Sequence, residues 1–200
     1  MTTASITLRE LLGLGQTPLR LSDAALVMID CQNTYRRGIM QLTGVEPALQ
    51  EARKLLTLAR DHKIPVFHVQ HDAGAGTPYD IGAEIGAIAD EVAPIAGEPV
   101  IVKHYPNAFV QTDLDQRLKA AGIDKIILAG FMTHMCINST AHGGFNLGYQ
   151  ATIVASTTAT RPLRAANGKL LTAQEVHDAA IASSRDLYAS IADTVEDLPL

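Results

Sequence analysis

Residues 24–30 of this chain read AALVMID, an unbroken apolar run that ends in a carboxylate. An apolar run of this length without polar alternation is typical of a strand that is buried on both faces of a sheet. Similar runs predict further strands at 65–69, 99–102, 125–129 and 152–155, and a short sixth strand at 191–194. Strands buried on both faces belong mainly to parallel sheets that carry helices on both sides.

Helical patterns separate these strands. Apolar residues recur at helical spacing over 46–62, and further helices are predicted over 80–92, 112–121, 133–147 and 173–190. Thr133 and Thr172 are expected to cap the last two helices. The repeated strand–helix–strand order predicts an α/β fold with three layers, α/β/α, around a parallel sheet.

The composition fits one globular domain, predicted over residues 1–200 with an N-terminal extension at 1–22. Hydrophobic residues make up 47% of the 200 residues, and the formal charge of −5 offers no basic excess for binding nucleic acid. No apolar run approaches the ~20 residues that a membrane span needs. The first ten residues show no secretory signal, and two cysteines cannot form a disulfide framework, so we expect a cytoplasmic protein with reduced thiols.

Three chemically active residues lie just after predicted strands, where parallel sheets bind their ligands. Taken singly, Asp30 is most simply a turn residue, Lys103 a solvated charge and Cys136 a small buried hydrophobe. Together they supply the base, the cation and the nucleophile of covalent acyl chemistry. Cys136 is expected in the first turn of a helix, where backbone N–H groups favour a thiolate and can hold an oxyanion. In the strand order 3-2-1-4-5-6, Lys103 has to reach across about 10 Å to Asp30.

The stretches around these residues resemble the isochorismatase-like cysteine hydrolases, which include nicotinamidases and N-carbamoylsarcosine amidohydrolases. The matching stretches are LVMIDCQN (26–33), PVFHVQHD (65–72), VKHYPNAF (102–109), GFMTHMCINSTA (130–141) and GYQATIVASTTATR (148–161). The combination of K-x-x-x-x-A-F with G-x-x-T-x-x-C-x-x-x-T-A is specific, and the resemblance extends over about 24–197. It implies a Rossmann-like sheet of six strands and a catalytic triad of Asp30, Lys103 and Cys136.

The resemblance also implies a non-proline cis peptide bond between Phe131 and Met132, and an oxyanion hole formed by the N–H groups of Met132 and Cys136. Nicotinamidases of the family bind a metal through an Asp-x-His pair, which is absent from HVQHDAGAGTPYD at 68–80. We therefore expect no metal and no other cofactor, with His71 and Asp72 as loop residues that shape the pocket. Isochorismatases that cleave a vinyl ether typically carry glycine in place of this cysteine, so the thiol indicates C–N bond hydrolysis through a thioester.

Three functions stay open from the sequence. The leading one is a cysteine-dependent hydrolase of an amide or ureido bond in a small molecule. The alternatives are an isochorismatase-type vinyl-ether hydrolase and a non-catalytic small-molecule-binding or structural oligomer. Tyr105, Phe109 and Phe131 are expected to line the substrate pocket, and the segments 34–44 and 73–80 to cover it as mobile loops. A homo-oligomer, dimer or larger, is expected, with no nucleic-acid or membrane partner.

Other polar and thiol residues have simpler interpretations. Cys31 follows Asp30 directly, so on an extended strand it faces the core. Arg36, Arg37 and Arg161 lie near the same rim and could pair a substrate carboxylate, although solvated surface arginines are more common. His177 is expected to make a structural hydrogen bond from the last long helix.

Overall fold

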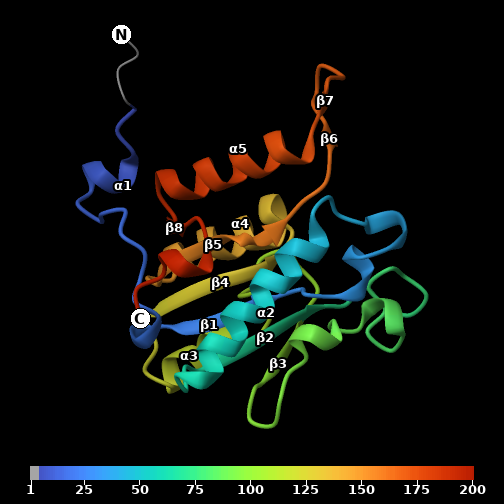
Figure 1. Ribbon diagram of the computed structural model, residues 1–200, viewed down its shortest axis with the longest axis horizontal. Coiled ribbons are helices and arrows are strands. Elements are labelled where there is room, and N and C mark those ends of the chain that lie inside the picture. Colours follow the sequence, from blue (N-terminus) through green and yellow to red (C-terminus); the bar gives the residue numbers. More distant parts are fainter. Residues whose placement is uncertain (1–4) are drawn as a thin grey trace.

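The computed structural model describes residues 5–200 and contains a sheet of six parallel strands in the order β3-β2-β1-β4-β5-β8 (Figure 1). The order confirms the predicted 3-2-1-4-5-6, with β8 as the sixth strand. The strands of this sheet are β1 (Ala25–Ile29), β2 (Val66–His71), β3 (Val100–Lys103), β4 (Lys125–Phe131), β5 (Gln150–Ala159) and β8 (Ser190–Ala192). Two short strands, β6 (Leu163–Arg164) and β7 (Leu170–Leu171), form a separate antiparallel hairpin that projects from the body.

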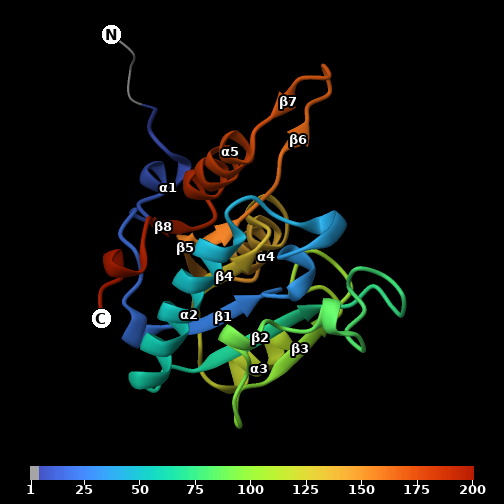
Figure 2. The ribbon, with the colours of Figure 1, turned by 45° about the vertical axis from the view of Figure 1, so that its right-hand side comes forward.

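Helices cover both faces of the sheet, which confirms the three-layer fold (Figure 2). One face is covered by α2 (Val45–Asp61), and the other by α3 (Leu114–Ala120) and α4 (Asn138–Asn146), with α5 (Ala173–Asp186) packed beside α4. Alternate residues of β1 enter different cores, because successive side chains of a strand point to opposite faces. Leu26 and Met28 face α2, whereas Val27 and Ile29 face α3 and α4. Both faces are buried, so the strand is apolar without interruption.

The segment between β2 and β3 is not the helix predicted over 80–92. It contains only two short 3₁₀ turns, Glu84–Gly86 and Asp90–Val92. The Asp80 carboxylate accepts hydrogen bonds from the N–H groups of Gly76 and Gly82, which holds the chain in a loop. At Gly86, a Cβ atom would lie 2.1 Å from the Asp80 carbonyl oxygen, so the chain folds back on itself there.

Strand β5 is longer than the predicted 152–155. The prediction missed its second half, because that half carries hydroxyl side chains instead of an apolar run. After a shift of register, Thr158 pairs with Gly130 and Ala159 with Phe131. The hydroxyls of Thr157 and Thr158 donate to the carbonyls of Val154 and Ala155 nearby in the chain, at 2.7 and 2.9 Å. Internal hydrogen bonds thus let polar side chains remain buried at the end of the strand.

The predicted extension at 1–22 is described from residue 5 onward and packs against α5. It contains the short helix α1 (Leu8–Leu11), which Thr7 and Glu10 cap reciprocally. The Arg9 guanidinium donates to the carbonyl of Leu187, just beyond α5, at 3.1 Å. Among the helices of the described chain, none is both long enough and apolar enough to cross a membrane.

Candidate active site

Three strand ends bring Asp30, Lys103 and Cys136 together beneath the surface. The Nζ atom of Lys103 lies 2.7 Å from Asp30 Oδ2 and 3.4 Å from Cys136 Sγ. Asp30 follows β1 and Lys103 ends β3, so the lysine side chain crosses over the end of β2, which lies between them. Asp30 and Lys103 are fully buried, and Cys136 is 5% exposed. The sequence singled out these three residues, and the fold makes them neighbours.

The backbone around Asp30 is unusual. Asp30 has a φ of +51°, in the left-handed region, directly after the strand. On the neighbouring strand, Gly130 has a φ of +119°, and a Cβ atom there would lie 1.9 Å from the Ile29 carbonyl oxygen. Only glycine allows β4 to approach β1 this closely. The peptide bond at the end of β4, between Phe131 and Met132, is cis.

The triad holds one cation and two acids. Burial raises the pKa of the Asp30 carboxyl, while the nearby Lys103 ammonium acts in the opposite direction. Burial also raises the pKa of the Cys136 thiol, the Asp30 charge adds to this rise, and Lys103 opposes it. In a buried site, one ammonium neutralises one anion. Asp30 is the closer of the two to Nζ, so we assign the negative charge to Asp30 and the proton to the Cys136 sulfur.

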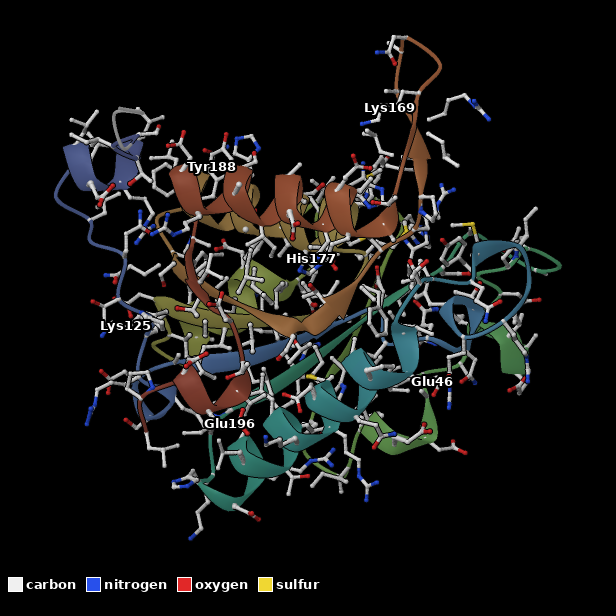
Figure 3. All side chains as sticks on the ribbon, turned by 45° about the horizontal axis from the view of Figure 1, so that its top comes forward. Glu46, Lys125, Lys169, His177, Tyr188 and Glu196 are labelled. Carbon is white, nitrogen blue, oxygen red and sulfur yellow. The ribbon has the colours of Figure 1, made fainter. Side chains whose placement is uncertain are left out.

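The expected helix start at Cys136 is wrong in its detail. Cys136 lies in a π-helical turn, Thr133–Ile137, which leads into α4, and Thr133 does not cap it. Instead, the Thr133 hydroxyl donates to Thr158 Oγ1 at 3.0 Å and lies 3.1 Å from His177 Nδ1. His177 lies on the sheet-facing side of α5 (Figure 3), and its predicted structural hydrogen bond is confirmed. Since burial dominates at Cys136, the resting group is a thiol and not the thiolate that the sequence suggested.

An aromatic cluster lies beside the triad, and of its rings the sequence analysis named only Phe131 as a pocket residue. The ring of Tyr35 meets those of Phe131 and Tyr79 edge-on, at centroid distances of 5.7 and 5.8 Å. Tyr79 also meets the ring of His71 at 5.0 Å. Tyr35 and Tyr79 come from the two segments expected to cover the pocket, so each segment places one tyrosine there. The sequence offered one signal for this part of the site, because His71 ends β2, next to the strand that carries Lys103.

The proposed pocket wall is corrected in one place. Phe109 does not line the site, because it stacks on Tyr149 at 5.4 Å and packs beneath Gly144 of α4. Phe131 contacts Tyr35 in the aromatic cluster. Tyr105 is 44% exposed, and its place in the pocket wall stays a prediction.

The three arginines near the rim differ in their partners. Arg36 pairs with Glu46 and Glu91, and Arg37 pairs with Glu84. Arg161 makes no ion pair within residues 5–200, and its buried Nε has no hydrogen-bond partner there.

The charge of Arg161 acts on two groups beside the site. Burial lowers the pKa of His134, which follows Thr133, and the positive charge of Arg161 lowers it further. It also works against the burial that raises the pKa of Tyr79 in the aromatic cluster. Arg161 is therefore a cation close to the aromatic cluster, without an ion-pair partner among the described residues.

A cavity of about 790 Å³ lies on another side of the Thr133–Ile137 turn, between α2, β5 and α5. Its lining includes Thr158 and His177, but none of the triad residues. The cavity therefore touches the hydrogen bonds behind Thr133 and not the Cys136 sulfur.

Comparison with known proteins places these features in a family. The family described as Isochorismatase domain matches residues 24–196. An uncharacterized isochorismatase family protein of Bacillus subtilis is 38% identical over 173 residues, which cover 85% of this chain and 96% of that protein. The maleamate amidohydrolase of Pseudomonas putida is 33% identical over 160 residues, 72% of each chain. The crystal structure of an isochorismatase from Pseudomonas putida KT2440 superposes with a TM-score of 0.93 at 32% identity, over 98% of this chain and 100% of that one. The resemblance drawn from the motifs is thus confirmed, and this chain is an enzyme that belongs to the isochorismatase family of hydrolases.

Proposed function

We propose that this enzyme hydrolyses a C–N bond, in an amide or ureido group of a small molecule, through a thioester on Cys136. The observation that carries the proposal is the position of the Lys103 ammonium, which contacts both the Asp30 carboxylate and the Cys136 sulfur. A vinyl-ether hydrolase needs an acid but no thiol at this place. A binding protein needs neither a buried thiol nor a buried ion pair beside it.

In the proposed mechanism, Asp30 carries a proton between the two halves of the reaction. The Cys136 sulfur attacks the carbonyl carbon, and the thiol proton passes to Asp30. The N–H groups of Met132 and Cys136 hold the oxyanion of the tetrahedral intermediate. Its collapse breaks the C–N bond, the leaving nitrogen takes the proton from Asp30, and an acyl thioester remains.

Water completes the cycle. Asp30 takes a proton from a water molecule as the water oxygen attacks the thioester carbon. Collapse of this second intermediate breaks the C–S bond and releases the acid, and the proton returns to the sulfur. Lys103 remains an ammonium throughout and stabilises whichever of the two groups carries the negative charge.

We further propose that the substrate carries a carboxylate, which Arg161 binds. Arg161 is the cation near the site that lacks an ion-pair partner within residues 5–200. An arginine without a partner is suited to bidentate binding of a carboxylate. The maleamate amidohydrolase relative acts, by its name, on the amide of a carboxylic acid.

The test is a screen for ammonia release from small primary amides and ureido compounds, each assayed with and without a carboxylate. Cys136→Ala should abolish turnover, whereas Cys31→Ala, which removes a buried thiol from the core, should retain it. Arg161→Ala should raise KM selectively for the carboxylate-bearing compounds. In a parallel assay with a vinyl-ether substrate, hydrolysis that survives in Cys136→Ala but is lost in Asp30→Asn would instead support vinyl-ether chemistry.

Three further expectations belong to this proposal. The enzyme is proposed to act on its small-molecule substrate without a cofactor, to assemble as a homo-oligomer and to work in the cytoplasm. Size-exclusion chromatography with light scattering tests the assembly, and activity after exhaustive chelation tests the cofactor.

A further inference from the structure

The Lys103 ammonium has a third partner that the mechanism above does not use. Besides the ion pair with Asp30 and the hydrogen bond to Cys136, its Nζ atom lies 3.2 Å from Nδ1 of His71. An ammonium group has three donors and no acceptor. The fully buried ammonium thus has an ion pair with Asp30 and hydrogen-bond contacts with His71 and Cys136.

We propose that His71 is a positioning residue, whose neutral imidazole accepts a hydrogen bond from Lys103 and holds the ammonium between Asp30 and Cys136. The inference rests on the proposed function, since it assigns His71 a role in preparing the nucleophile. It replaces the expectation that His71 is a loop residue that only shapes the pocket.

The direction of the hydrogen bond fixes the form of the ring. Because an ammonium can only donate, Nδ1 of His71 has to carry the lone pair, and Nε2 carries the ring proton. Burial, followed by the charges of Lys103 and His104, lowers the pKa of His71 to about 4, against a smaller opposite effect of Asp72. The ring is therefore neutral at neutral pH.

A neutral acceptor is what this position requires. The triad already holds two acids beside one cation, and a carboxylate in place of His71 would add a further buried negative charge. An apolar residue would leave a buried N–H of Lys103 without an acceptor, so the flexible lysine would move or attract water. Imidazole satisfies the N–H bond and leaves the charge of the site unchanged.

The surroundings hold the ring in place. His71 pairs with Lys103 in the parallel register of β2 and β3, so the two side chains start from adjacent positions. The backbone N–H of His71 donates to Gln32 Oε1 at 2.9 Å, and the backbone carbonyl of His71 accepts from Gln32 Nε2 at 2.9 Å. Tyr79 meets the ring edge-on from the loop side. Backbone, glutamine and tyrosine thus restrain the imidazole before any substrate binds.

The experiment measures the rate at which iodoacetamide alkylates Cys136 in the full-length protein at pH 7, with the modified residue identified by mass spectrometry. His71→Ala removes the acceptor, and His71→Asn replaces Nδ1 by an amide oxygen at a similar distance from the backbone. His68→Gln is the matched control, because His68 is a buried histidine of the same strand whose Nε2 contacts Glu98 at 2.8 Å, away from the triad.

We expect His71→Ala to slow alkylation about tenfold or more, which corresponds to one pKa unit of lost thiolate stabilisation. His71→Asn and His68→Gln should stay close to the wild-type rate. The inference is overturned if His71→Ala reacts like the wild type, or if His71→Asn reacts as slowly as His71→Ala. Alkylation needs no substrate, so an incorrect substrate class would change none of these rates.

A second measurement uses the wild-type protein and does not depend on the folding of a variant. Proton–nitrogen correlation spectra of the histidine rings identify which nitrogen of His71 carries the proton. We expect a protonated Nε2 and a bare Nδ1 at pH 7. A protonated Nδ1 in the wild type would overturn the inference.

Discussion

Replacing Lys103 by methionine should destabilise the fold as well as abolish catalysis, because it leaves Asp30 charged and alone in the core. Both side chains are fully buried, and their charged atoms lie 2.7 Å apart. Removing one partner of a buried ion pair typically costs about 3–5 kcal/mol, because the other charge loses its compensation. For a chain of this length, that loss corresponds to a fall of about 10 °C in Tm.

The pH dependence of this loss has a definite sign. Without Lys103, the strongest influence that lowers the pKa of Asp30 is lost, and burial, the largest cause, holds the pKa of the folded carboxyl above its unfolded value. A raised carboxyl pKa stabilises the fold below the unfolded pKa, and this contribution is lost as the pH rises. The difference in unfolding free energy between wild type and Lys103→Met should therefore be largest at pH 7 and narrow toward pH 5.

The assay is urea unfolding of the wild type, Lys103→Met, Asp30→Asn and the double variant. Asparagine tolerates the left-handed backbone of Asp30, whose φ is +51°, so it removes the charge without adding backbone strain. The double variant should recover most of the stability, which gives a coupling energy of about 2 kcal/mol or more. A loss below about 1 kcal/mol in Lys103→Met, or full additivity of the two changes, would refute the buried ion pair.

Two further predictions concern the strand ends. Gly130→Ala should cost more than about 3 kcal/mol of unfolding free energy or prevent folding, because its Cβ would lie 1.9 Å from the Ile29 carbonyl oxygen. Gly97→Ala has no atom within 4 Å of the added Cβ, so it should cost about 1 kcal/mol through its backbone conformation alone. Thermal unfolding compares the two, and equal losses would contradict the close approach of β1 and β4. Acid should weaken the fold between pH 6.5 and 4, because the unfolded chain protonates His71 there while the folded chain, with a pKa of about 4, does not. The loss is about 1.4 kcal/mol per pKa unit at most and smaller for a partly exposed ring, and unchanged stability in urea unfolding at pH 7 and pH 4.5 would argue against it.

Much of the fold was predictable because its signals are local. The apolar run before Asp30 indicates a strand buried on both faces, and the helical repeat over 46–62 indicates α2. The helix expected over 80–92 failed for a physical reason. The hydrogen bonds of the Asp80 carboxylate and the close backbone contact at Gly86 favour a loop, and neither feature is visible in the periodicity of apolar residues.

The residues of the proposed triad could also be selected from the sequence, but the residues that contact them could not. Asp30, Lys103 and Cys136 could be selected because each follows a predicted strand and because their motifs occur together. The roles of His71, Tyr35 and the turn at Thr133 depend on contacts between segments that are far apart in the chain.

The sequence by itself determined the order of strands and helices and the residue types at the strand ends. Only the tertiary structure decided that the Lys103 ammonium is shared by an acid, a thiol and an imidazole. The reason is geometric. The parallel register of β1, β2 and β3 places Asp30, His71 and Lys103 at one rim, and the lysine side chain has the length to cross β2. A buried ammonium then needs every acceptor within reach, whichever segment supplies it.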